Sequence, residues 1–211
     1  MFGNRSEAAM KLAEALSSYR GKNPLVLAIP RGAVPMAKIV AEELGGSFDV
    51  VLVRKLRAPF QPELAIGSID ESGWAYISPH AGSSGASKEY IESEKETQME
   101  TIRKRRSQYT PIRPPIDPAG RIVIVIDDGL ATGATMISAL HSLRARNPAR
   151  LICAVPVAPP DTLKKVEAMA DEVVCLLTPD YFMAVGQFYM DFSQVEDEEV
   201  IEILRESTQS V

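Results

Sequence analysis

The sequence predicts an α/β fold: a mainly parallel, doubly wound sheet with a small hood and an inserted hairpin plus helix. The first observation is an uninterrupted β-branched run at residues 122–126, which is typical of a strand buried on both faces of a parallel sheet. The second is an alternation of short apolar runs and helical patterns around it, which indicates βαβ units with right-handed crossovers. The third is a break in that alternation at residues 59–118.

The N-terminal elements follow the alternation. Apolar residues recur at helical spacing over residues 6–19, with Ser6 as a plausible cap, and Gly21 and Pro24 end this helix. Gly45-Gly46 ends the second helix. The elements expected between these points and the interruption are a strand at 25–29, a helix at 36–44 and a strand at 48–53.

The interruption predicts a separate substructure. Runs at 64–69 and 74–78 flank a bend at Gly73, which indicates a hairpin, and the Gly-Ser-Ser-Gly at 82–85 predicts a flexible linker. Residues 88–109 are acidic at the start and basic at the end, as the helix dipole favours, and so sparsely apolar that we expect a mostly solvated helix. The prolines that follow predict a stiff connector.

The C-terminal third returns to the alternation and then leaves it. Five of the twelve Phe and Tyr residues crowd into residues 179–192, and an acidic helix is expected at 196–204. The remaining expected elements are a helix from 136 to 144, a strand at 151–157, a helix at 162–169 capped by Asp161, and a strand at 172–177. We expect a single domain, residues 1–211, with its core at 20–58 and 119–178, an insert at 59–118 and a hood and tail at 179–211.

Composition excludes several classes of protein. The net charge of −5 argues against a general nucleic-acid binder, and no apolar run approaches the length of a membrane span or of a signal-peptide core. Cys153 and Cys175 lack metal-site spacing and read as free thiols of a reducing compartment. These features predict a cytoplasmic protein without nucleic-acid or membrane partners.

Residues 127–135 carry the most specific chemical pattern. Asp127 and Asp128 end the buried strand, and Thr132-Gly133-Ala134-Thr135 opens a helix. Backbone N–H groups and the dipole at a helix start favour phosphate, and the threonine hydroxyls add donors. Because carboxylates repel phosphate, the acids are expected to contact hydroxyls, a metal ion or both. A sugar phosphate satisfies both halves of the pattern.

This stretch closely resembles the phosphoribosyl pyrophosphate (PRPP) signature of the type I phosphoribosyltransferases. The resemblance implies that the two acids hold the ribose hydroxyls and that the Thr-Gly-x-Thr loop holds the 5′-phosphate. It implies the type I fold, and with it we expect Mg²⁺ as cofactor, PRPP and a nitrogenous base as small-molecule substrates, and a homodimer.

The residues 30–35 are similar to the pyrophosphate loop of the same family, most of all to xanthine phosphoribosyltransferases. That loop often carries an unusual cis peptide, and the similarity implies pyrophosphate contacts for Arg31 and Gly32. Three cations follow the strand expected at 48–53, where ligands bind in open α/β sheets. The family also places basic residues there against pyrophosphate.

The tail resembles the hood segment of hypoxanthine-guanine phosphoribosyltransferases. The resemblance implies that Phe182 stacks on the base and that Asp191 lies near pyrophosphate and metal, although Phe188, Tyr189 and Phe192 also fit simple packing of the tail onto the core.

The leading hypothesis is an enzyme that transfers phosphoribose from PRPP to a nitrogenous base with release of pyrophosphate. The alternative is a non-catalytic module of the same fold that senses PRPP, and catalytic turnover discriminates the two. A remote third class is an aspartyl-phosphate receiver domain. The expected site residues are Asp127, Asp128 and Arg57 for catalysis; Arg31, Gly32, Arg54, Lys55, Asp127, Asp128, Gly129, Ala131, Thr132, Gly133, Ala134 and Thr135 for PRPP; Phe182 and Val185 for the base; and Asp191 for metal.

Overall fold

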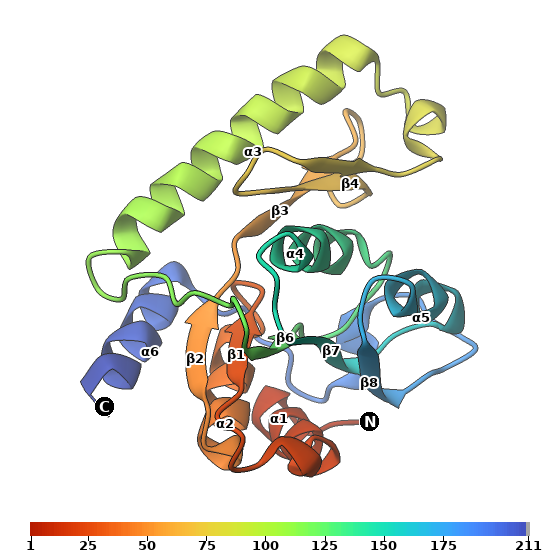
Figure 1. Ribbon diagram of the computed structural model, residues 1–211. Coiled ribbons are helices and arrows are strands. Elements are labelled where there is room, and N and C mark those ends of the chain that lie inside the picture. The colour runs from red at the N-terminus through yellow and green to blue at the C-terminus, as the bar shows by residue number, and fades with distance from the viewer. Residues whose placement is uncertain (210–211) are drawn as a thin grey trace.

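A five-stranded parallel sheet forms the centre of the computed structural model, which describes residues 1–209 (Figure 1). The predicted fold class is therefore confirmed. Equivalent residues of neighbouring strands lie side by side, as Ala28 and Ile126 do, so the carboxyl ends of the strands share one edge. The order across the sheet is β2 (Ser47–Val50), β1 (Leu25–Ala28), β6 (Ile122–Ile126), β7 (Arg150–Val157) and β8 (Glu172–Leu177).

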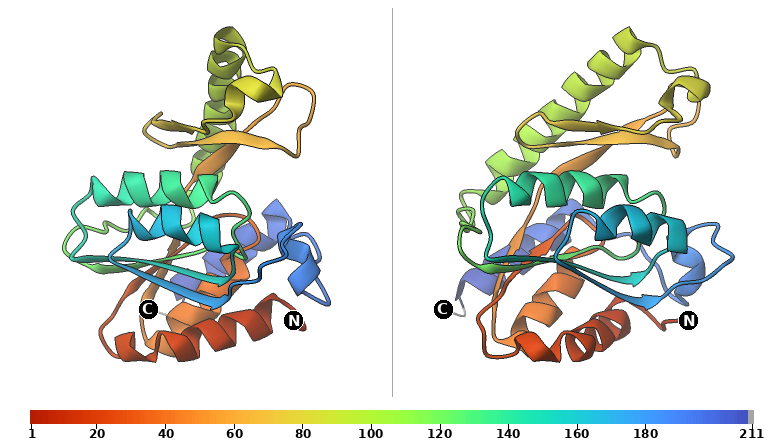
Figure 2. Two further views of the ribbon diagram at one scale, coloured as in Figure 1. Left: turned by 90° about the vertical axis from the view of Figure 1, so that its right-hand side faces the viewer. Right: turned by 45° about the vertical axis from the view of Figure 1, so that its right-hand side comes forward.

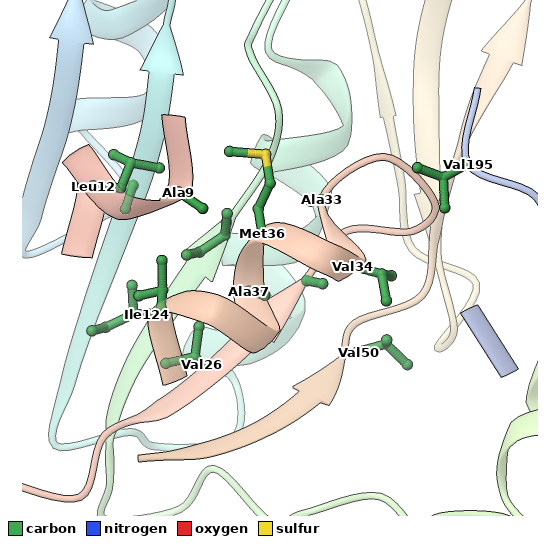
Figure 3. Close-up of a cluster of buried hydrophobic side chains, with 14 of the residues drawn as sticks. Ala9, Leu12, Val26, Ala33, Val34, Met36, Ala37, Val50, Ile124 and Val195 are labelled. Carbon is green, nitrogen blue, oxygen red and sulfur yellow. The ribbon is translucent and has the colours of Figure 1, made fainter. Parts of the chain in front are cut away.

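Helices cover both faces of this sheet (Figure 2). The helices α1 (Arg5–Ala15) and α2 (Val34–Leu44) lie on one face, and α4 (Ala134–Arg144) and α5 (Pro160–Glu167) lie on the other. On the first face, Met36 of α2 packs among residues of α1 and the strands, such as Leu12 and Ile124 (Figure 3). Because both sheet faces are buried, β6 can be a continuous β-branched run.

The interruption forms a second, antiparallel sheet of three strands, β3 (Val53–Arg57), β4 (Ala65–Asp70) and β5 (Ala75–Ile77). The long helix α3 (Lys88–Tyr109) has the predicted bounds and lies across this sheet, with Gln98, Ile102 and Tyr109 buried. The small sheet lies over α4, on the side of that helix away from the central sheet (Figure 2).

Several local expectations were wrong. The run expected as one strand at 48–53 divides: β2 ends at Val50, and Val53 begins β3 of the other sheet. The residues 82–85 are no free linker, because a 3₁₀ turn, Ala81–Ser84, precedes a left-handed Gly85. Asn4 caps α1 in place of Ser6, and Pro159 precedes α5, so Asp161 lies in the first turn of that helix.

The tail pairs with the N-terminal segment. Phe2 and Tyr189 form a bridge, Phe2 N–H donates to the carbonyl of Phe188 (2.8 Å), and Met190 N–H donates to the carbonyl of Phe2 (2.8 Å). A 3₁₀ turn, Val185–Phe188, precedes this contact, and the helix α6 (Asp197–Gln209) follows it. The N-terminal segment and the tail therefore lie side by side.

No helix in the described part of the chain combines the length and apolar character that a membrane crossing requires.

Candidate functional site

A cavity of about 590 Å³ opens beyond the carboxyl ends of β1 and β6. Open α/β sheets bind ligands at this edge. Its walls come from Arg5 of α1, the residues that follow β1, the strand β3 with residues 62 and 63 after it, the loop after β6, and the tail. Five cations and three carboxylates line it, so the cavity is basic in a protein of net charge −5. The charged residues are Arg5, Arg31, Arg54, Lys55, Arg57, Glu63, Asp127 and Asp128.

The loop after β6 is arranged for an anion. Leu130 N–H donates to the carbonyl of Val157 (2.9 Å), and the Thr162 hydroxyl donates to the carbonyl of Ala131 (2.7 Å). The end of β7 and the helix α5 therefore both hold the loop. Gly133, in the left-handed region at φ 76°, caps α4. Within residues 1–209, the N–H groups of residues 131, 132 and 133 have no acceptor, and all three residues line the cavity. Free N–H groups at a helix start suit a phosphate.

Asp127, the first member of the acid pair, is partly buried, as Asp128 is. Its Oδ1 accepts from Asp128 N–H (2.9 Å), and its Oδ2 lies 3.5 Å from the Thr135 hydroxyl. Burial, and secondly the charge of Asp128, raise the pKa of Asp127 to about 8. Asp127 forms no ion pair within residues 1–209, so a cation or a set of hydroxyl donors from a ligand would stabilise its charge.

Asp128 has a cationic partner that the sequence did not suggest. Arg5 donates to Asp128 Oδ2 from Nε (3.0 Å) and from Nη2 (2.8 Å). Gly32 also lies against this oxygen, because a Cβ at residue 32 would be 2.0 Å from it. Burial raises the pKa of Asp128 and Arg5 opposes that rise. Residues from three distant segments thus meet at one carboxylate oxygen.

The predicted pyrophosphate cations line the same cavity. Arg54, Lys55 and Arg57 lie within β3 of the small sheet and not in a loop at the end of a central strand. Burial, with the charges of Arg105, Arg57 and Arg31, lowers the pKa of Arg54 to about 10, which marks a crowded group of cations. Lys55 has no ion pair among the residues that the structure describes.

Arg31 lies in the loop after β1 and faces the tail. The Pro30–Arg31 peptide bond is cis, as the resemblance to the family implies. Arg31 Nη1 lies 3.2 Å from Glu196 Oε2 and 3.5 Å from Asp197 Oδ2, at the start of α6. An anion that binds Arg31 therefore competes with two carboxylates.

The tail brings one of its predicted residues, Val185, to the cavity, together with residues that were not predicted. Val185 lines the cavity, but Phe182 does not; its ring packs against Phe188 with centroids 5.3 Å apart. The aromatic residue on the cavity wall is Phe192. Asp191 is exposed and absent from the lining, and its Oδ1 accepts from Ser193 N–H (3.0 Å), so the geometry gives a metal role for Asp191 no support.

Among the cavity residues that sequence reasoning missed are Arg5, Glu63, Phe192 and Gln194. One signal could have indicated Arg5: a cation in the first turn of a helix opposes the helix dipole, so a fixed acidic partner is expected. Phe192 and Gln194 lie in an irregular tail whose register no local pattern specifies.

The donor set fits Mg²⁺ in one particular way. Residues 1–209 hold no group of three or more His, Cys, Asp or Glu side chains that could enclose a metal ion. The cavity offers a pair of adjacent carboxylates, and Mg²⁺ is commonly held by one or two carboxylates together with substrate phosphates and water. The pair therefore suits a cation that arrives with an anionic substrate.

Comparison with known proteins agrees with this geometry. A family model described as a phosphoribosyl transferase domain matches residues 4–193. A protein of Mycobacterium tuberculosis H37Rv, provisionally named a phosphoribosyl transferase, is 39% identical over 205 residues, which cover 97% of this chain and 46% of that protein. The chain thus spans about half the length of the curated relatives it matches. The crystal structure of TT1426 from Thermus thermophilus is 44% identical, covers 97% of this chain and 98% of that one, and superposes with a TM-score of 0.80.

Proposed function

The chain belongs to the phosphoribosyl transferase domain family, and from this premise we propose that it transfers phosphoribose from PRPP to a nitrogenous base and releases pyrophosphate. One observation carries the proposal: an anion loop and a carboxylate pair share one cavity with a group of cations, Arg31, Arg54, Lys55 and Arg57. A sugar with a phosphate at one end and a pyrophosphate at the other is complementary to all three parts.

In this proposal the 5′-phosphate binds the N–H groups and hydroxyls of residues 129–135, with Thr132 and Thr135 as side-chain donors. Asp127 and Asp128 accept from the ribose hydroxyls and fix the ring. The pyrophosphate lies toward the cations of β3, above all Lys55 and Arg57, and toward Arg31 and Gly32. The base then approaches from the tail side, along Val185 and Phe192.

The difficult step is the departure of pyrophosphate while positive charge grows on the ribose. Lys55, Arg54 and Arg57 would stabilise the negative charge that develops on the leaving group. The carboxylate pair would stabilise the positive ring, and the anion loop would hold the sugar in line for attack. Mg²⁺, held by Asp127, Asp128 and oxygens of the substrate, would supply further neutralisation of the pyrophosphate.

A screen of acceptors tests this proposal. Pyrophosphate release is measured with PRPP, Mg²⁺ and a panel of purines, pyrimidines and small heterocycles. Release that depends on one acceptor supports the transferase. Binding of PRPP with no turnover across the panel favours the alternative, a non-catalytic module of the same fold that senses PRPP.

Cellular location and oligomeric state also belong to the proposal. We propose a reducing, cytoplasmic environment because Cys153 and Cys175 are both free thiols. We propose a homodimer, which the mass in solution by light scattering tests: a mass near 23.0 kDa would exclude it.

A further inference from the structure

We propose that Arg5 is a positioning residue of this site: it holds one oxygen of Asp128 so that the other oxygen is presented to the ribose. The inference rests on the proposed function and adds to it a residue of the N-terminal helix. Arg5 lies far from the PRPP signature in the sequence, and no motif assigned it a role.

The Arg5 side chain is fixed on every side. Nε and Nη2 both donate to Asp128 Oδ2, at 3.0 and 2.8 Å, and Nη1 donates to the carbonyl of Ser193 at 2.6 Å. The guanidinium lies over the ring of Phe192, 3.9 Å from its centroid. Only 12% of the side chain is exposed. Such a side chain has little freedom to move when a ligand binds.

The two oxygens of Asp128 are thereby made different. Oδ2 receives both bonds from Arg5, whereas no other residue within 1–209 donates a hydrogen bond to Oδ1. The residue's own carbonyl accepts from the Tyr189 hydroxyl at 2.7 Å, which restrains the main chain as well. Asp128 is therefore held at two points, with one acceptor oxygen left for a hydroxyl of the ligand.

Arg5 also connects the site to the N-terminal segment and to the tail. Main-chain bonds pair residues 2–3 with residues 188–191, and the Asp191 N–H to Gly3 carbonyl bond measures 2.9 Å. Arg5 is the side chain that continues this pairing into the cavity, since it touches the tail and the acid pair together. A simple stabilising ion pair would not need to lie on the cavity wall.

A double-mutant cycle tests the inference, because a residue that acts through Asp128 loses its effect once Asp128 is altered. The variants are Arg5→Met, Asp128→Asn and the two combined, with Lys11→Met on the exposed face of the same helix as the matched control. The readouts are the Kd for PRPP with Mg²⁺, kcat/KM and the melting temperature. Arg5→Lys joins the set, because it keeps the charge and loses the planar fork.

We expect Arg5→Met to lower kcat/KM by about 10²-fold, the size of a small misplacement in an active site. Arg5→Lys should recover part of that loss, and Lys11→Met should match the wild type. In the Asp128→Asn background, Arg5→Met should change kcat/KM by no more than about twofold. Should Arg5→Met fail to fold, Arg5→Lys takes its place in the cycle.

Two results would overturn the inference. One is a loss of kcat/KM in the double variant equal to the product of the losses in the two single variants, and the other is wild-type kcat/KM in Arg5→Met. Either leaves the proposed function intact, provided that the wild type binds and turns over PRPP. If the wild type binds no PRPP, the proposed function fails and the positioning role fails with it.

Discussion

The Ser68 hydroxyl lies 2.6 Å from the carbonyl oxygen of Ala134 and donates a hydrogen bond to it. Ala134 is the first residue of α4, directly after the anion loop, and Ser68 lies in the middle of β4. Ser138 Oγ is also 2.6 Å from Ser68 Oγ, so Ser138 is the donor in that pair. The small sheet is thus bonded to the helix that begins at the site, and all of these groups are buried.

Replacing Ser68 with Ala should lower the free energy of unfolding by about 1–3 kcal/mol, because it leaves the Ala134 carbonyl and the Ser138 hydroxyl buried with one fewer partner. Ser138→Ala keeps the bond from Ser68 to Ala134 and should cost less. Urea denaturation of both variants measures the difference. Equal costs would show that the bond from Ser68 to the Ala134 carbonyl adds nothing to stability beyond the bond between Ser68 and Ser138.

Asp127→Asn and Asp128→Asn should differ in stability and agree in activity. Asp127→Asn should stay within about 1 kcal/mol of the wild type near pH 7, since its carboxyl has a raised pKa and gives up little charge. Asp128→Asn removes the partner of a nearly buried Arg5 and should cost about 1–3 kcal/mol. Turnover should fall by about 10²–10³ in each. Full activity in both variants, measured as pyrophosphate release, would show that the two carboxylates take no part in the reaction.

The ligand-free protein should lose stability as the pH rises. The pKa of Asp127 is about 8 when folded against an ordinary value of 3.8, so the folded state holds a proton that the unfolded chain has released. This contribution is complete below pH 3.8 and is lost as the pH rises through about 8. Unfolding free energies of wild type and Asp127→Asn, compared from about pH 6 to about pH 9, should therefore show a flatter curve for the variant. Parallel curves would contradict the raised pKa.

Glu196→Gln should tighten PRPP binding, because Glu196 competes for Arg31 in the ligand-free protein. The pair is partly exposed, so we expect the Kd to fall only about two- to fivefold. Glu198→Gln, on the same turn and without an ion pair among the described residues, is the matched control. Weaker binding in Glu196→Gln would mean that the carboxylate orients Arg31 for the ligand instead.

The central strand, its acid pair and the following helix could be predicted from sequence because each is specified by adjacent residues. The division of residues 48–53 could not, since Val50 and Val53 belong to one apolar run and only pairing with β1 or β4 assigns them to different sheets. The bounds of α3 were predicted correctly, between a Gly-Ser-Ser-Gly stretch and a run of prolines.

Site residues that are adjacent in the sequence could be predicted, and those that come from distant segments could not. Arg5 and Asp128 are 123 residues apart, and no spacing rule relates them. In the tail, the bridge between Phe2 and Tyr189 sets which aromatic faces the cavity, and it turns Phe192 inward while Phe182 packs against Phe188. That pairing is a tertiary contact, which the aromatic composition of the tail cannot specify.

We propose that one cavity binds PRPP through the anion loop and the acid pair. Calorimetric titration of PRPP with Mg²⁺ into the ligand-free protein measures this binding. We expect saturable binding with one site per chain, weaker binding of ribose 5-phosphate, and a melting temperature that rises with PRPP, since a ligand at about 100 times its Kd adds about 2.7 kcal/mol. Asp127→Asn should weaken the binding. No heat and no thermal shift with millimolar PRPP and Mg²⁺, in a protein that melts cooperatively, would contradict this proposal.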